Sequence, residues 1–183
     1  MKQNIPKECS WVIVYDKTVA NQYNVVDAVN LHSPFTGDFG NPNRNFALDN
    51  IDLEDDDWVY VLDDDNILHP KWHEVVSRNI NSKYDIITWG QLTGYNDIRL
   101  CPTKTPKIGN IDTASYMVNG KIMKTLRYSM QRGADGELAE QVSENGKVLM
   151  IDEYLCYYNY LNFSSNRNDI NHVRVAEWQT LWS

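Results

Sequence analysis

The stretch Trp58-Val-Tyr-Val-Leu-Asp-Asp-Asp-Asn66 places a run of apolar residues directly before three aspartates. Apolar residues on both faces predict a central strand of a sheet that is covered on both sides. The aspartates follow at the carboxyl end of this strand, where open α/β sheets bind their ligands. The stretch therefore predicts an acidic ligand site at the edge of an α/β sheet.

The spacing of the aspartates indicates what they bind. If the strand continued through them, Asp63 and Asp65 would lie on one face and Asp64 on the other. Two ionised carboxylates about 6 Å apart repel by about 3 kcal/mol at an effective dielectric constant of about 20, which favours a raised pKa or a bound cation. Oxygen ligands suit a hard divalent cation such as Mn²⁺ or Mg²⁺. The alternative is a solvated turn, which we expect for the acidic run at 55–57.

Apolar runs that suit strands alternate along the chain with helical patterns, which predicts an α/β fold. We expect a single domain over 1–183, built as a three-layer α/β/α sandwich around a mostly parallel mixed sheet. The segment 90–108 reads as irregular. Strands are expected at 11–15, 58–62, 84–89, 111–118, 148–151 and 154–161, and helices at 43–50, 69–77, 121–128, 134–143 and 173–182.

Composition and charge narrow the class of protein. The net charge is −8 and Lys and Arg do not cluster, which disfavours binding to nucleic acid or anionic lipid. The longest apolar run has five residues, far short of the roughly 20 that span a bilayer. The first residues lack the apolar core of a secretory signal, so we expect a cytoplasmic protein. Buried free thiols are expected at Cys9, Cys101 and Cys156, because their spacing fits neither a disulfide framework nor a zinc site.

Two motifs in order resemble a known family. The run Asn41-Pro-Asn-Arg-Asn-Phe-Ala-Leu-Asp-Asn50, followed by Trp58-Val-Tyr-Val-Leu-Asp-Asp-Asp-Asn-Ile-Leu-His-Pro70, is similar to family-2-type glycosyltransferases of the GT-A fold, with their xRNxAL helix and DxD motif. The resemblance continues through 111–116 and 134–138, and so covers most of the chain from about Trp11 to about Tyr160. It implies transfer of a sugar from a nucleotide-diphosphate sugar, with UDP favoured and GDP possible, to a hydroxyl of a glycan or another acceptor.

The resemblance also implies roles for the aspartates. Asp63 and Asp65 match the residues on the metal-diphosphate and ribose side of the donor, and Asp64 lies between them in the same donor site. His172 matches in position a metal ligand that some GT-A enzymes supply near the C-terminus. These matches imply a Mn²⁺ or Mg²⁺ ion held by Asp63, Asp65 and His172.

Three further residues carry implied roles. Arg44, expected in the first turn of a helix and therefore solvent-accessible, matches a residue that touches the donor. Asp16 ends the first strand and matches an aspartate near the nucleoside. Asp135 matches the general base of inverting members. Its flanking glycines would allow a close approach to a ligand, and the alternative is that Asp135 caps the following helix.

The family pattern is incomplete here, which leaves other functions open. Members begin with a strand and a helix before the equivalent of 11–15, whereas only ten residues precede this strand. A degenerate nucleotide-sugar or carbohydrate-binding domain is therefore one alternative. A nucleotidyltransferase is another, although its usual Gly-rich basic loop is absent from the sequence. The sugar, the base, the acceptor and the oligomeric state stay open.

Overall fold

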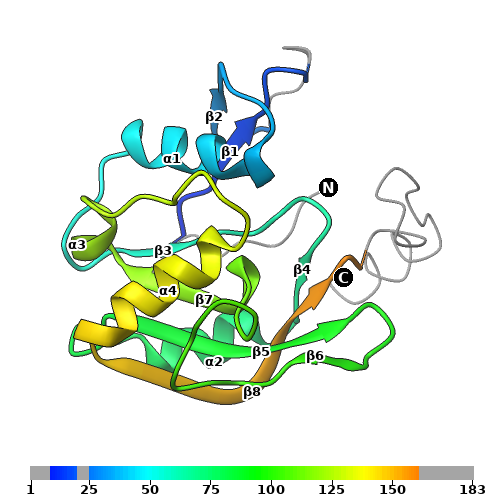
Figure 1. The fold of residues 1–183 in the computed structure, drawn as a ribbon, viewed down its shortest axis with the longest axis vertical. Coiled ribbons are helices and arrows are strands. Elements are labelled where there is room, and N and C mark those ends of the chain that lie inside the picture. The colour runs from blue at the N-terminus through cyan, green and yellow to red at the C-terminus, as the bar shows by residue number, and fades with distance from the viewer. Residues whose placement is uncertain (1–8, 20–24, 161–183) are drawn as a thin grey trace.

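A six-stranded mixed sheet forms the centre of the computed structural model, which describes residues 9–19 and 25–160 (Figure 1). A separate two-stranded parallel sheet lies beside α1 at one end of the molecule. The small sheet consists of β1 (Val12–Tyr15) and β2 (Val29–His32). The strands of the large sheet run in the order β3 (Trp58–Tyr60), β7 (Tyr116–Asn119), β5 (Ile86–Thr93), β8 (Val148–Tyr158) and β4 (Ile67–Leu68), with β6 (Ile98–Leu100) paired to β5.

The strand directions confirm a mixed sheet and correct its expected parallel character. Within the large sheet only β5 and β8 pair in parallel, whereas β7 pairs antiparallel with both β3 and β5. The strands β3, β5 and β8 still point the same way, but β7 separates the first from the other two. The expectation of a mostly parallel sheet is therefore wrong at the level of neighbouring strands. An apolar run reports burial and not the direction of the neighbour.

The helices complete the layers. Four of the five expected helices are present with shifted ends, and the fifth, at 173–182, lies outside the described residues. The helix expected from His69 begins only at Trp72, because the His69 carbonyl and Nδ1 accept the Trp72 and Lys71 amides in a turn. The helices are α1 (Asn41–Asp49), α2 (Trp72–Asn79), α3 (Gly120–Met123) and α4 (Ala134–Asn145), with short 3₁₀ helices η1 (Asp38–Gly40) and η2 (Thr113–Ser115).

Alternating residues of the central strands divide the core into two parts. Ile86 and Val118 pack on the side of α4, whereas their neighbours Ile87 and Met117 pack on the side of α2. Figure 1 shows α4 in front of the sheet and α2 behind it. The period of two of a β-strand thus supplies one apolar face to each helical layer. The expected α/β sandwich is confirmed.

Backbone conformation fixes where α1 begins. The four residues before it, from Gly37 to Gly40, all have positive φ, with values of 78°, 46°, 57° and 78°. Two of them are glycines, which adopt this region without steric cost. Pro42 follows inside the first turn of α1, where its missing amide leaves no hydrogen bond broken. The sequence Gly37-Asp-Phe-Gly-Asn-Pro42 therefore sets the start of the helix sharply.

Candidate functional site

Polar side chains of helix α1 contact residues that follow the ends of two strands, β1 and β3. Asn43 donates from Nδ2 to Oδ2 of Asp16, at the end of β1, over 3.2 Å. Its neighbour Arg44 reaches Asp63, beyond the end of β3, with 2.6 Å between Nη2 and Oδ1. Two of the predicted donor residues, Asp16 and Asp63, are thereby brought to one helix.

Arg44 is mostly buried, contrary to the expectation that a first-turn arginine is solvent-accessible. Its side chain is 14% exposed, against 38% for that of Asp63. The second terminal nitrogen donates to Oδ1 of Asn41 over 2.7 Å and to the Phe39 carbonyl over 3.1 Å. Burial lowers the pKa of Arg44, but the Asp63 carboxylate outweighs that effect and the net shift is upward. The guanidinium is therefore charged and fixed in place.

The aspartates themselves lie in a turn. Strand β3 ends at Tyr60, and the Asn66 amide donates to the Asp63 carbonyl over 3.1 Å. The strand does not continue through Asp63, Asp64 and Asp65, so the expected sharing of one strand face does not hold. Asp64 is exposed, whereas Asp63 and Asp65 are half-buried.

Two of the three ligands expected for a metal ion, Asp63 and Asp65, lie in the described part of the chain. Over residues 9–19 and 25–160 no group of three or more His, Cys, Asp or Glu side chains is gathered to hold one. His172 lies outside the described residues. A Mg²⁺-type site in phosphate-binding proteins is commonly made by one or two carboxylates, completed by phosphate oxygens and water. The turn carrying Asp63 and Asp65 fits that donor set, and the metal remains a prediction.

Asp16 is held as an anion. Its Oδ1 accepts from the backbone amide of Thr18 over 2.8 Å and from the Thr18 hydroxyl over 2.7 Å. These two bonds, helped by Asn43, lower the pKa of Asp16 to about 2. A charged acceptor therefore stands at the carboxyl end of β1, suited to a hydroxyl or amide donor of a ligand.

Asp135 lies inside the first turn of α4. The N-cap of this helix is Gly133, with φ of 83° and no side-chain capping bond, so the alternative of Asp135 as the cap is wrong. Burial raises the pKa of the Asp135 carboxyl, and the charge of Asp112 adds to the rise. A half-buried carboxylate with a raised pKa is the usual form of a general base.

The second flanking glycine serves packing and not ligand approach. A Cβ on Gly136 would lie 2.6 Å from the backbone Cα of Ile108. The helix needs a glycine there so that the 107–110 turn can pack against it. The sequence signal was read correctly as a close approach, but the partner is the protein itself.

The neighbouring acids are engaged elsewhere. Asp112 pairs with Arg99 over 3.0 Å and accepts the Ala114 amide at the start of η2. Glu137 accepts a hydrogen bond from Ser129 on the exposed side of α4. Of the three acids considered as a base, Asp112 is held by an ion pair and Glu137 by the Ser129 hydroxyl, whereas Asp135 interacts with backbone amides of its own helical turn.

Sequence reasoning missed two asparagines of α1 that bind the segment before α4. Asn41 donates to the Gln131 carbonyl over 3.1 Å. Asn45 donates to the Tyr128 carbonyl over 2.8 Å and accepts the Tyr128 amide over 2.9 Å. The available signal was the density of asparagine in Asn41-Pro-Asn-Arg-Asn45. Buried amides form such paired bonds with a backbone because they both donate and accept.

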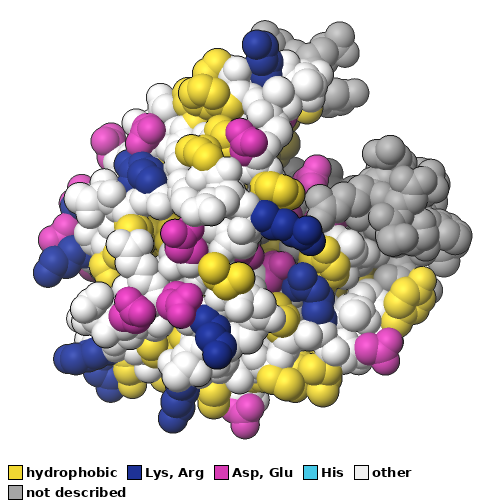
Figure 2. Space-filling model, in the orientation of Figure 1, with side chains coloured by type: hydrophobic (Ala, Val, Ile, Leu, Met, Phe, Trp, Pro, Cys, Tyr) yellow, Lys and Arg dark blue, Asp and Glu magenta, His cyan; other side chains and the backbone are white. Residues whose placement is uncertain are grey.

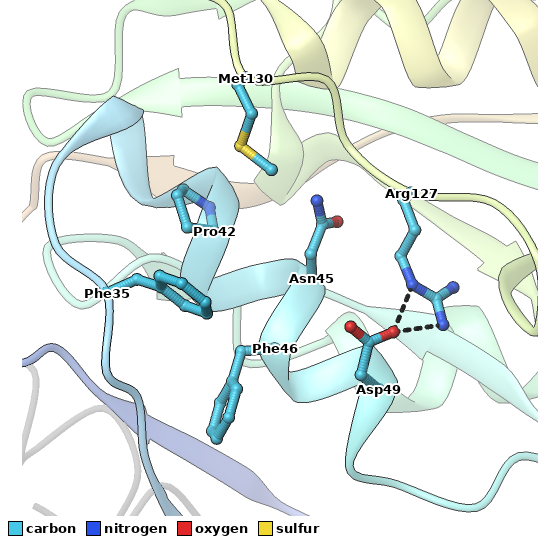
Figure 3. A pocket seen from close by; sticks show the side chains of 7 residues that line it. All are labelled: Phe35, Pro42, Asn45, Phe46, Asp49, Arg127 and Met130. Carbon is cyan, nitrogen blue, oxygen red and sulfur yellow. Dashed lines mark hydrogen bonds and ion pairs between the residues drawn. The ribbon is translucent and has the colours of Figure 1, made fainter.

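A cavity in the described part of the chain lies on another face of α1 and is not the predicted donor site (Figure 3). Its volume is about 400 Å³. None of the predicted site residues lines it. The Asp49–Arg127 ion pair, at 2.8 Å, borders it on one side. The lining side chains are Phe35, Pro42, Asn45, Phe46, Asp49, Arg127 and Met130.

Charges of both signs are mixed on the visible face of the molecule. On the face shown in Figure 2, Lys and Arg side chains alternate with Asp and Glu, and the described residues there form no continuous basic patch. Within the described ranges no helix combines the length and the apolar character needed to cross a membrane.

Comparison with known proteins finds a solved structure of similar fold. No family model matches the chain, and no curated protein matches it. The crystal structure of S. aureus TarS 1-349, a glycosyltransferase, superposes with a TM-score of 0.62 over 85% of this chain and 53% of that one, at 16% sequence identity. The fold is glycosyltransferase-like. The chain spans about half the length of the TarS structure, and at this identity the likeness is one of fold alone.

Proposed function

We propose that the protein is a metal-dependent glycosyltransferase that moves a sugar from a nucleotide-diphosphate sugar to an acceptor hydroxyl with inversion. The observation that carries the proposal is the Arg44–Asp63 pair, 2.6 Å long and fixed on α1. Helix α1 also binds Asp16 through Asn43, and the charge of Arg44 interacts with that of Asp135. The glycosyltransferase-like fold supports the same chemistry.

The donor would lie along the carboxyl ends of β1 and β3. Asp16 would accept a hydrogen bond from the nucleoside, and the turn at Asp63, Asp64 and Asp65 would face the diphosphate. A Mn²⁺ or Mg²⁺ ion bound by Asp63 and Asp65, with His172 as a further proposed ligand, would neutralise the charge of the leaving diphosphate. Arg44 would hold Asp63 in place and add positive charge beside it. UDP is the favoured nucleotide, and GDP is possible.

Asp135 would act on the acceptor. Its carboxylate takes the proton of the acceptor hydroxyl while the acceptor oxygen bonds to the anomeric carbon. The bond from that carbon to the phosphate oxygen breaks, and the nucleoside diphosphate leaves with the electron pair. Attack from the face opposite the leaving group inverts the anomeric configuration. The raised pKa of Asp135 suits this role, because a stronger base accepts the proton more readily.

Donor binding is expected to require a divalent cation, because diphosphate and carboxylates otherwise repel. A thermal-shift titration with UDP, UDP-sugars and GDP-sugars tests this with Mn²⁺ and with excess EDTA. At a ligand concentration of about 100 times Kd, binding stabilises the folded state by about 2.7 kcal/mol. We expect that stabilisation with Mn²⁺ only, and we expect Asp65→Ala to abolish the difference between the two conditions.

Asp56→Ala is the matched control, because Asp56 is an exposed aspartate in the neighbouring acidic loop. It should keep the full effect of Mn²⁺. Equal donor affinity in EDTA would refute the metal-dependent site. Cation-dependent binding without transfer to any acceptor hydroxyl would identify a binding domain in place of an enzyme.

A further inference from the structure

A buried tyrosine of the central sheet holds the backbone of Asp135. Tyr116 is the first residue of β7, its side chain is 3% exposed, and its hydroxyl donates to the Asp135 carbonyl over 3.1 Å. The first turn of α4 has no capping side chain at Gly133. The Tyr116 hydroxyl is therefore a buried anchor for the turn from which the Asp135 carboxylate projects.

A second tyrosine links this anchor to the donor side. The Tyr116 and Tyr128 side chains interact with each other, and the Tyr128 ring lies 5.6 Å from the guanidinium carbon of Arg44. Arg44 in turn pairs with Asp63. Since a carbonyl only accepts, the Tyr116 hydroxyl donates its proton to Asp135. A continuous row of contacts thus runs from Asp63 to Asp135.

The two tyrosines stay neutral over the working range of pH. Burial raises the pKa of Tyr116 well above its ordinary range and that of Tyr128 to about 12. Neither is suited to exchange protons with a substrate near neutral pH. Their hydroxyls act as fixed hydrogen-bond groups, which is a structural contribution to the position of other residues.

We propose that Tyr116 is a positioning residue that sets the distance between the Asp135 carboxylate and the acceptor hydroxyl. The inference rests on the proposed function of Asp135 as the general base. One bond to the carbonyl of that same residue limits how far its Cα, and with it the carboxylate, moves. Without the bond, the first turn of α4 keeps its backbone bonds from the Ala134 and Glu137 amides to the Gln131 and Gly133 carbonyls. It also keeps the Ser129–Glu137 contact and its packing on Ile108, but it loses the hydrogen bond from Tyr116 of the central sheet.

Tyr116→Phe tests the proposal, with Tyr60→Phe as the matched control. The Tyr60 hydroxyl also donates to a backbone carbonyl, that of Ala114, over 3.0 Å, but it does not contact α4. Both variants lose one hydroxyl and one such bond, so their melting temperatures should fall by similar amounts. For Tyr116→Phe we expect kcat to fall on the order of tenfold with an unchanged KM for the donor, because small misplacements of a catalytic group are costly. Tyr60→Phe should keep its kcat.

The pH dependence of kcat supplies a readout that lost stability does not move. Burial raises the pKa of Asp135, so a first turn that loosens and admits water lowers that pKa again. The acid limb of the kcat profile should therefore shift to lower pH in Tyr116→Phe and stay in place in Tyr60→Phe.

Asp135→Asn, measured in parallel, tests the role of Asp135 as the base separately from the positioning role of Tyr116. If it transfers sugar normally, the proposed base is wrong and the role of Tyr116 falls with it. If it is inactive while Tyr116→Phe and Tyr60→Phe share the same kcat and the same acid limb, the positioning role alone is overturned. A loss of kcat and a shifted acid limb that are both confined to Tyr116→Phe would support the positioning role.

Discussion

Asp135→Asn is expected to bind cation and donor normally and to transfer almost no sugar. An amide cannot take the proton of the acceptor hydroxyl, and losing such a transfer costs about 100-fold to 10,000-fold in rate. The substitution keeps the size of the side chain, and Gly133 remains the N-cap of α4. The loss should therefore appear in kcat, measured as release of the nucleoside diphosphate with an acceptor present.

Glu137→Gln is the control for this variant. Glu137 lies in the same helical turn and undergoes the same change of charge, but its side chain is exposed and accepts from Ser129. It should transfer sugar at nearly the normal rate. If Asp135→Asn keeps near-normal transfer, Asp135 is not the base. A large loss in Glu137→Gln would move the role to that residue.

The wild-type pH profile gives an independent check on Asp135. Its pKa is raised by burial from the ordinary value of 3.8, and only the ionised form accepts a proton. The kcat should be full above the raised pKa and should fall as the pH drops through it. The acid limb is thus expected above pH 3.8.

Arg44→Ala is expected to lower both stability and donor binding. It removes a charge-assisted bond to Asp63 and two more to Asn41 and the Phe39 carbonyl, from a side chain that is 14% exposed. Hydrogen bonds of charged groups contribute about 1.5–3 kcal/mol, so the free energy of unfolding should fall by an amount of that order. Urea denaturation without ligand measures it, and titration with donor and Mn²⁺ measures the second loss.

Arg78→Ala is the comparison. Arg78 and Glu74 also form an ion pair, but their side chains are 71% and 57% exposed on α2. Exposed pairs contribute about 0.2–1 kcal/mol, so this variant should unfold almost as the wild type does. An Arg44→Ala protein as stable as Arg78→Ala would show that the Arg44–Asp63 bond is not formed in the free protein.

The strands that build the core were predictable because each is a continuous apolar run. The stretches 58–62 and 84–89 correspond to β3 (Trp58–Tyr60) and β5 (Ile86–Thr93), although β3 ends earlier and β5 begins later than expected. The expected strands 148–151 and 154–161 prove to be parts of one strand, β8 (Val148–Tyr158), which continues through Asp152 and Glu153. Those two residues are exposed, so polar side chains interrupted the pattern without interrupting the strand.

Three short strands, β2, β4 and β6, have too little local sequence pattern to be predicted. Strand β4 has only two residues, and β2 has exposed residues at both ends, so neither shows a pattern of burial along its own length. Strand β6 lies in the segment 90–108 that was expected to be irregular, and it forms by pairing with β5. Pairing between distant segments decides such strands, and a local pattern does not contain it.

For the site, motif spacing predicted that Arg44 and Asp63 belong together, but not how. The ion pair, the burial of the guanidinium and the turn at Asp63 depend on the angle at which α1 meets β3. The contacts of Tyr116 with Asp135 depend on the antiparallel insertion of β7, which the sequence did not indicate. The sequence thus predicted which residues belong to the candidate site, but it did not predict how their side chains are arranged.

The left-handed residues before α1 give the helix a single rotational setting. Each residue of an α-helix turns the chain by about 100°, so if one residue inserted between Gly37 and Gly40 displaced the start of α1 by one position, Arg44 would swing by that angle. Asn43 and Asn45 would turn with it, away from Asp16 and Tyr128. Length in this short turn is therefore as constrained as any side chain of the site, although none of its four residues is proposed to touch a substrate.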